Sequence, residues 1–307
     1  MNRTHQELLR TTLGNISPAG TAADDAIASR TDGAAAPVPI SIATRPGKPE
    51  DTERKAVAAE PRSETMPGTP VAWKPSMDDL PSLQPRTAAA EQFRRLRSRL
   101  LEYRAQQPMQ ALLMSSALPQ EGKSFVAVNL AVGLNQHRGT RVLLVDGDMR
   151  RYSVQRYFGT VHKPGLADFL AGTHSAQEVM QCADAKTVAQ YPGLAHLSII
   201  PGGGMQEHVA DLSEDSHFGS LIEFARPHFD WIVVDSSPVT LVSDAVNLAR
   251  HCDGVLLVVR SGVTKYQQAQ QAQAELQAAN LIGVVLNAVE DRPAPSYYGY
   301  GPAGADA

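Results

Sequence analysis

Short apolar runs alternate with longer stretches of helical character over the last two thirds of this chain. Most of the apolar runs are unbroken, which is typical of strands buried on both faces of a parallel sheet. They predict strands at residues 111–115, 142–146, 197–201, 231–235, 255–260 and 283–287. The stretches between them predict helices at residues 124–137, 153–158, 216–226, 243–250 and 264–279. This order predicts one three-layer α/β domain over residues 89–290, with a mostly parallel sheet.

The first 88 residues have a different pattern. They contain 11 of the 21 prolines, and Ala, Thr, Gly and charged residues fill most of the remainder. Such a stretch buries too little apolar surface to offset the entropy lost on ordering. We therefore predict a disordered Pro/Ala-rich region at residues 1–88, with one short helix at residues 6–13. Trp73 within it is interpreted either as a loosely packed anchor on the domain or as part of a docking peptide.

A long helix is predicted at residues 89–107 from residue propensities. Its apolar positions recur at helical spacing and predict a buried face formed by Phe93, Leu96 and Leu100. Three charged residues at intervals of three share a neighbouring face: Glu91, Arg94 and Arg97. The pattern alone favours a solvated face with internal ion pairs.

The clearest candidate for chemistry is the strand, loop and helix that begin at residue 110. Gly122, Lys123 and Ser124 end the loop and open an apolar helix. A phosphate-binding P-loop requires this order, because loop amides and the helix N-terminus then face one anion. The lysine reaches the β- and γ-phosphates, and the serine hydroxyl ligates Mg²⁺. Ala117 stands where the usual pattern has its first glycine, so an ordinary strand-to-helix turn remains the alternative on this stretch alone.

Two further predicted strands end in carboxylates. Asp146 ends one strand and is followed by Asp148, and Asp235 ends another. Ligands of open α/β sheets bind beyond the carboxyl ends of the strands, and Mg²⁺ prefers carboxylate, water and phosphate oxygens. A single Asp at a strand end is often a turn or cap residue, but three on two strands favour a metal-assisted phosphate site. Asp146 and Asp148 point to one side of an extended chain, so one can serve the metal while the other faces an incoming hydroxyl.

Three of the eight tyrosines lie within four residues: Tyr297, Tyr298 and Tyr300. Pro and Gly around them prevent regular structure, so residues 291–307 are predicted to form a flexible tail. Tyrosines on such a tail can be delivered into the active site of another subunit. The alternative is a terminus without function.

Charge and cysteine content narrow the range of partners. The formal net charge of −4 is too small to favour nucleic acid or an anionic membrane. The two cysteines lack metal-type spacing and are too few for a disulfide framework. No apolar run approaches the ~20 residues that span a bilayer, and the N-terminus has no signal-peptide apolar region. We therefore expect a soluble cytoplasmic protein that associates with a membrane only through a partner.

Taken together, these segments resemble the bacterial tyrosine kinases of capsule and exopolysaccharide export. Residues 115–124 resemble the Walker A motif of that family, residues 143–151 its second, family-specific Walker motif, and residues 232–235 its Walker B motif. The resemblance extends over about residues 88–300, including residues 156–159, 164–172 and 253–260. It implies a P-loop NTPase fold that uses ATP and Mg²⁺.

The resemblance implies a role for each matching residue. The catalytic residues would be Lys123, Asp146 and Asp148, and the Mg²⁺ ligands would be Ser124, Asp146 and Asp235. The ATP-binding residues would be Ala117, Pro119, Gln120, Glu121, Gly122, Lys123, Ser124, Phe125, Arg260 and Asn287, the last near the adenine. The phospho-acceptors would be Tyr297, Tyr298 and Tyr300. Glu91, Arg94 and Arg97 are similar to the oligomerisation signature of the family, which replaces the solvated-face interpretation.

Several positions depart from the family pattern. Gln120 stands where the family usually has Gly, Gly147 replaces Ala, and Tyr152 replaces Pro. Residues 236–238 are Ser-Ser-Pro rather than Thr-Pro-Pro, and a usual Pro-Asn-Pro element is absent around residues 202–209. None of these changes removes a phosphate or metal ligand. Gln120 is the change expected to alter the loop if that position needs a positive φ.

The resemblance also implies an activity and partners. It predicts an autokinase that phosphorylates tail tyrosines in trans within a homo-oligomer, with a ring as the expected form, and regulates exopolysaccharide chain length or export, like the stand-alone kinase subunit of exopolysaccharide clusters. A transmembrane polysaccharide copolymerase would activate it and a cognate tyrosine phosphatase would oppose it. One alternative is an ATPase of the partition or division-site type, whose extra lysine near Ser116 or Ala117 is absent here. Another is an inactive scaffold of the export complex, against which the intact Lys123 and the three aspartates argue.

Overall fold

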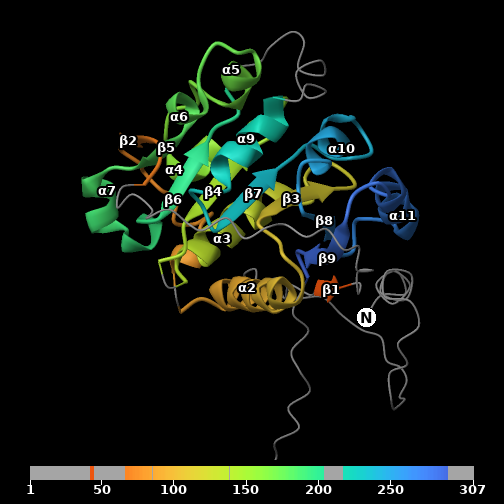
Figure 1. Ribbon diagram of the computed structural model, residues 1–307. Helices are drawn as coiled ribbons and strands as arrows, with labels where there is room; N and C mark the ends of the chain where they lie inside the picture. Colours follow the sequence, from red (N-terminus) through yellow and green to blue (C-terminus); the bar gives the residue numbers. More distant parts are fainter. Residues whose placement is uncertain (1–41, 45–65, 85, 138, 204–216, 290–307) are drawn as a thin grey trace, which may run out of the picture.

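A single mixed sheet forms the centre of the computed structural model, which describes residues 42–44, 66–84, 86–137, 139–203 and 217–289. Within these residues nine strands pair in the order β1-β9-β8-β3-β7-β4-β6-β5-β2 (Figure 1). Their bounds are β1 (Ile42–Thr44), β2 (Thr69–Val71), β3 (Ala111–Ser116), β4 (Val142–Asp146), β5 (Gln181–Ala183), β6 (Leu197–Ile200), β7 (Trp231–Asp235), β8 (Gly254–Arg260) and β9 (Leu281–Asn287). Neighbours run parallel except for β1 with β9 and β5 with β6.

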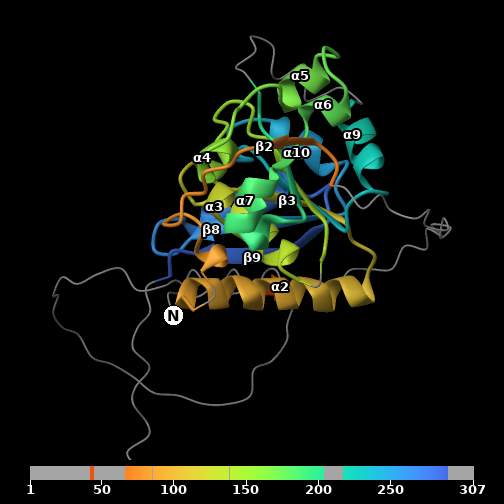
Figure 2. The ribbon, with the colours of Figure 1, turned by 90° about the vertical axis from the view of Figure 1, so that its left-hand side faces the viewer.

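Helices cover both faces of this sheet. One face packs against α2 (Ala88–Gln106), α3 (Lys123–Asn135) and α4 (Val154–Phe158). The other face packs against α5 (Leu166–Leu170), α6 (Ala176–Val179), α9 (His217–Ala225), α10 (Asp244–Ala249) and α11 (Tyr266–Glu275). The short segments η1 (Pro81–Leu83), α7 (Ala185–Gln190) and η2 (Pro192–Leu194) complete the described helices. Figure 2 shows α2 running along the outside of the domain.

The sequence of β3 explains why two cores form. Side chains alternate between the faces of a strand, so Leu112 packs into the core beneath α3 and Leu113 packs into the core on the opposite face. All six residues of β3 are buried, as expected for a central strand. The predicted three-layer α/β architecture is therefore confirmed. Among the described residues no helix is both long and apolar enough to cross a bilayer.

Predicted and observed elements agree best for the long apolar strands. The strands predicted at residues 142–146 and 231–235 have those bounds in the structure. The helix predicted at residues 264–279 is shorter, because α11 covers Tyr266–Glu275. The short elements β2, β5, α6 and α7 were not predicted, since runs of three to six residues are too short to show a periodicity.

The prediction of disorder over residues 1–88 is wrong for β1, which pairs with β9, and for residues 66–84, which we call the N-terminal arm. Within the arm, β2 pairs in parallel with β5 and extends the sheet. Trp73 is 4% exposed, its ring centroid lies 4.9 Å from that of Phe158, and its backbone N–H donates to Oγ1 of Thr187 over 3.0 Å. It is a buried anchor rather than an exposed docking residue. The helix predicted at residues 6–13 and the tail at residues 291–307 lie outside the described residues.

The arm also holds α4 against α3. The backbone N–H of Lys74 donates to Phe158 O over 2.7 Å, and that of Ser76 donates to Tyr157 O over 2.8 Å. On α3, the Asn129 amide donates to Asp79 O over 2.9 Å and accepts from the Ser82 N–H over 3.1 Å. The arm therefore fixes the two helices that begin at the carboxyl ends of β3 and β4.

The helix α2 packs its predicted apolar face, formed by Phe93, Leu96 and Leu100, against the domain. Glu91 forms an ion pair with Arg94 of the same helix, with 2.7 Å between Oε2 and Nη2. Arg97 donates from Nη1 to Gly133 O of α3 over 2.9 Å. Arg97 therefore fixes α2 to its own domain, and the role of all three residues in contacting another subunit stays a prediction.

Candidate active site

The loop between β3 and α3 has the backbone form of a phosphate-binding loop. Gly122 caps α3 with a φ of +88°, and a Cβ there would lie 2.0 Å from Nδ2 of Asn287. Glycine is therefore required at this position both by conformation and by space. Gln120 also has a positive φ of 64°. The usual glycine is thus replaced at a left-handed position, which costs about 1 kcal/mol, yet the loop keeps its turn.

Glu121 holds the loop from its buried side. Its side chain is buried, and its carboxylate accepts from the Leu118 N–H over 2.8 Å and from the hydroxyl of Thr264. Burial raises the pKa of Glu121 in spite of these hydrogen bonds and a further one from the Ala117 amide. Glu121 therefore holds the loop through its side chain, and its contact with ATP stays a prediction.

Two other predicted ATP-binding residues donate hydrogen bonds to carbonyl groups of the loop. Asn287, at the end of β9, donates from Nδ2 to Glu121 O over 2.9 Å. Arg260, at the end of β8, donates from Nη1 to Gln120 O over 3.3 Å. We call the group formed by Glu121, Thr264, Asn287 and Arg260 the rear support. Ala117 is fully buried beneath the loop, and its carbonyl accepts from the Thr240 hydroxyl.

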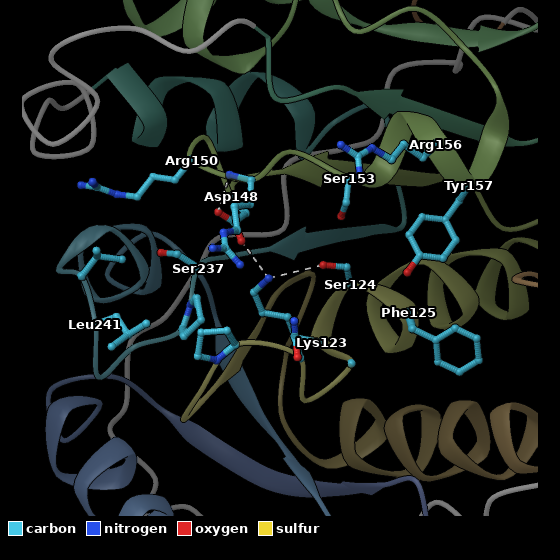
Figure 3. Close-up of a pocket in the computed structure, with 16 residues that line it drawn as sticks. Lys123, Ser124, Phe125, Asp148, Arg150, Ser153, Arg156, Tyr157, Ser237 and Leu241 are labelled. Carbon is cyan, nitrogen blue, oxygen red and sulfur yellow. Dashed lines mark hydrogen bonds and ion pairs between the residues drawn. The ribbon is translucent and has the colours of Figure 1, made fainter. Parts of the chain in front are cut away.

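A cavity of about 420 Å³ opens on the other side of the loop, a size suited to a small-molecule ligand (Figure 3). The predicted residues that line it are Pro119, Gln120, Gly122, Lys123, Ser124, Phe125 and Asp148. The lining residues that sequence reasoning did not single out for the site are Arg150, Arg151, Ser153, Arg156, Tyr157, Ser237, Pro238, Leu241 and Val242. They follow the carboxyl ends of β4 and β7, where ligands of such sheets bind. Four of them, Arg150, Arg151, Arg156 and Tyr157, also lie in segments whose sequence resembles the family.

Lys123 occupies the centre of the cavity wall (Figure 3). Its Nζ lies 2.8 Å from Oδ2 of Asp148, 4.0 Å from Oδ1 of Asp235 and 3.4 Å from the Ser124 hydroxyl. Burial lowers the pKa of Lys123, but the nearby carboxylates of Asp235 and Asp148 outweigh burial and raise it overall. The ammonium is therefore charged at neutral pH and available to a phosphate.

Asp146 and Asp235 end adjacent strands and are direct register partners of β4 and β7. Both side chains are fully buried, and burial together with their mutual proximity raises the pKa of Asp146. Its carboxylate accepts from the backbone N–H groups of Ser153 over 2.8 Å and Val154 over 3.0 Å, so it fixes the start of α4. Burial also raises the pKa of Asp235, although the Lys123 charge and the Ser124 hydroxyl lower it.

The residues of the cavity fit a magnesium ion. Neither carboxylate oxygen of Asp235 accepts a hydrogen bond of normal geometry from a described residue, which is unusual for a buried polar group. Asp235 and the Ser124 hydroxyl offer the hard oxygen ligands that Mg²⁺ takes in addition to phosphate and water. Asp146 is already engaged by backbone amides, so its metal and catalytic roles stay predictions. No cluster of three or more His, Cys, Asp or Glu side chains suited to hold a metal ion was found in the described part of the chain.

Comparisons with known proteins agree with this arrangement. The chain is 30% identical over 219 residues to the tyrosine-protein kinase YwqD of Bacillus subtilis, covering 71% of this chain and 88% of YwqD. It is 31% identical over 198 residues to the tyrosine-protein kinase CpsD of Streptococcus agalactiae, covering 63% and 81% of the two chains. Against the tyrosine-protein kinase wzc of Salmonella typhimurium it is 31% identical over 220 residues, which cover 71% of this chain but 29% of wzc. No family model matches the chain.

The fold leads to the same group of proteins. The kinase domain of the Escherichia coli tyrosine kinase ETK aligns with a TM-score of 0.64 and 26% identity, covering 81% of this chain and 90% of that structure. The BceF tyrosine kinase domain aligns with a TM-score of 0.59 and 26% identity, covering 72% and 91%. The P-loop, the charged Lys123 and the cavity therefore form a nucleotide-binding site on a P-loop NTPase fold.

Proposed function

Because this chain belongs to the family of bacterial tyrosine-protein kinases, we propose that it uses ATP and Mg²⁺ to phosphorylate tyrosines on the tail of a neighbouring copy. The expected acceptors are Tyr297, Tyr298 and Tyr300. The main support is the arrangement at Lys123: its largely buried ammonium lies 2.8 Å from Oδ2 of Asp148 and 4.0 Å from Oδ1 of the fully buried Asp235. Such a site can hold nucleotide phosphates on one side and orient a hydroxyl on the other.

In the proposed reaction the γ-phosphorus of ATP forms a bond to the phenol oxygen while its bond to the β–γ bridging oxygen breaks. ADP leaves, and the phenol proton passes to Asp148 or to water. A free tyrosine has a pKa of ~10 and a free aspartate ~3.9, so Asp148 acts mainly by orienting the phenol. Lys123 and the loop amides hold the phosphates, because a loose transition state is accelerated by positioning and charge stabilisation.

The metal would be held by Ser124 and Asp235, with Asp146 as a further candidate ligand. A magnesium ion held there would neutralise charge on the phosphates of the nucleotide. The rear support keeps the loop amides directed at the cavity, which removes the need to order them during the reaction.

Assembly and regulation extend the proposal beyond the single chain. We infer a homo-oligomeric ring in which α2, with Glu91 and Arg94 half-exposed, faces a neighbouring subunit. The proposed partners are a transmembrane polysaccharide copolymerase as activator and a tyrosine phosphatase, at the cytoplasmic side of the inner membrane during exopolysaccharide export. Each tail phosphate adds a charge of about −1.5 to −2, which would weaken the ring by repulsion.

Incubation of the full chain with γ-labelled ATP and Mg²⁺ tests the proposal. Label on the protein supports a kinase, label released only as phosphate supports an ATPase of the partition type, and neither result supports an inactive scaffold. Replacing all three tail tyrosines by Phe serves as the control. That variant should still hydrolyse ATP and lose most of its phosphotyrosine, and phosphotyrosine that persists elsewhere would contradict the acceptor assignment.

A further inference from the structure

Four cationic side chains line the cavity: Lys123, Arg150, Arg151 and Arg156. Of its lining side chains, Lys123 is paired with Asp148 at 2.8 Å, and Arg150 is paired with Asp244 of α10 at 2.8 Å. Arg151 and Arg156 are exposed and form no ion pair with any described residue. We call these two residues the arginine pair.

A neutral donor lies beside the arginine pair. The hydroxyl of Ser153 is buried and has no hydrogen-bond partner among the described residues. Its backbone is fixed by two contacts: its N–H donates to Asp146 over 2.8 Å, and its carbonyl accepts from the Arg156 N–H over 3.0 Å. Ser153 and Arg156 therefore belong to one turn, and Figure 3 shows both on the α4 side of the cavity, with Tyr157.

This combination is the chemistry of a phosphate site. Guanidinium groups form paired, charge-assisted hydrogen bonds to phosphate oxygens, and a free hydroxyl adds one more donor. The site lies on α4 and the segment before it, whereas Lys123 and Ser124 belong to the P-loop. A ligand that contacts both the arginine pair and the P-loop must carry a second phosphate, or another dianion, close to the reacting phenol.

The tail provides such a ligand once it has been phosphorylated. Tyr298 and Tyr300 are two residues apart, so in an extended segment their side chains point to the same side, about 7 Å apart. A phosphate on one of them can reach the α4 side of the cavity while the other hydroxyl faces Lys123 and Asp148.

We propose that Arg151, Arg156 and Ser153 bind a phosphotyrosine two residues from the acceptor, so that the first phosphate on a tail accelerates the next. This inference rests on the proposed function, because it requires transfer to tail tyrosines. Its consequence is that tails become either unphosphorylated or multiply phosphorylated, with few at the intermediate stage.

Synthetic peptides of residues 290–307 test the inference, with the full chain bearing Phe at Tyr297, Tyr298 and Tyr300 as the enzyme. Both peptides carry Tyr297→Phe and keep Tyr298 as the acceptor. Residue 300 is phosphotyrosine in one and Phe in the other. The phosphotyrosine peptide should have about a tenfold higher kcat/KM, mainly through a lower KM. Arg156→Gln should bring that ratio close to one, Arg156→Lys should restore part of it, and Arg250→Gln, an exposed arginine outside the cavity lining, should leave it unchanged.

Three results would overturn the inference. A ratio of one in the parent enzyme would show that the first phosphate is not recognised. If Arg156→Gln lowered kcat/KM equally for both peptides and raised the KM for ATP, the arginines would instead contact the nucleotide phosphates. Phosphorylation of neither peptide would contradict the proposed function itself, so failure of the function and failure of the inference are distinguishable.

Discussion

Buried polar groups on one side of the P-loop are hydrogen-bonded, whereas several on the other side are not. Behind the loop, Glu121 is satisfied by Leu118 and Thr264, and Asn287 holds the Glu121 carbonyl. On the cavity side, the carboxylate of Asp235 and the hydroxyls of Ser153 and Ser237 are buried without hydrogen-bond partners among the described residues.

This contrast separates residues that shape the loop from residues that act through it. Buried polar groups in folded proteins are nearly always hydrogen-bonded, so a cluster of unsatisfied ones marks the place where a polar ligand completes the site. Sequence motifs do not distinguish the two sides, because Glu121 and Lys123 belong to the same short stretch. Substitutions of the rear residues should therefore act on stability, and substitutions of the cavity residues should act on activity.

The largest effect is expected at Lys123. Replacing it by Met removes the cavity's buried cation and should lower autophosphorylation about 10²- to 10³-fold, the usual loss when one preorganised charge is removed. Incorporation of label from γ-labelled ATP measures it. Lys265→Met, an exposed lysine at the start of α11, is the matched control and should retain parental activity. If both variants lost autophosphorylation to a similar extent, the loss could not be assigned to the charge at the cavity.

Substitutions in the rear support should lower the stability of the fold. Glu121→Ala leaves the Leu118 amide and the Thr264 hydroxyl without their acceptor and should cost about 1–3 kcal/mol of unfolding free energy. Ser237→Ala removes an unsatisfied hydroxyl on the cavity side and should cost much less in the absence of ligand. Urea unfolding of both variants measures the difference. Equal costs would show that the two sides do not differ in the way described.

Asp235 should make stability depend on pH. Burial raises its folded-state pKa above the unfolded value near 3.8, so the folded state binds the extra proton in the window between them. The parent protein should therefore lose about 1–3 kcal/mol relative to Asp235→Asn as the pH rises from 4 to 8. Thermal unfolding of both proteins over that range, without nucleotide or metal, provides the measurement. If the stability of the two proteins changed equally with pH, the pKa of Asp235 would not be raised in the folded state.

The smallest effect concerns the strained turn. Gln120→Gly should relieve the positive φ at that position and raise the melting temperature by about 1–3 °C, since 1 kcal/mol corresponds to about 2–4 °C at this size. Differential scanning calorimetry is sensitive enough to detect the change. A lower melting temperature would indicate that the Gln120 side chain makes a stabilising contact that outweighs the strain.

The strands that carry the aspartates were predictable because unbroken apolar runs ending in Asp are visible without knowledge of the fold. The N-terminal arm was not, since Trp73 lies in a Pro-rich segment and hydrogen-bonds Thr187, 114 positions away. Arg156 and Tyr157 lie in a predicted helix and in a segment that resembles the family, but neither signal shows which way α4 faces, because its five residues are too few for a periodicity. The placement of Glu121 shows that motif membership does not fix the direction of a side chain.

Mass-spectrometric mapping of phosphotyrosine on the full chain, after incubation with ATP and Mg²⁺ and its membrane activator, tests the central claim most directly. We expect phosphate on Tyr297, Tyr298 and Tyr300 in the parent protein and almost none in Lys123→Met. Absence of phosphotyrosine from the tail, or equal modification of the Lys123→Met tail, would contradict it.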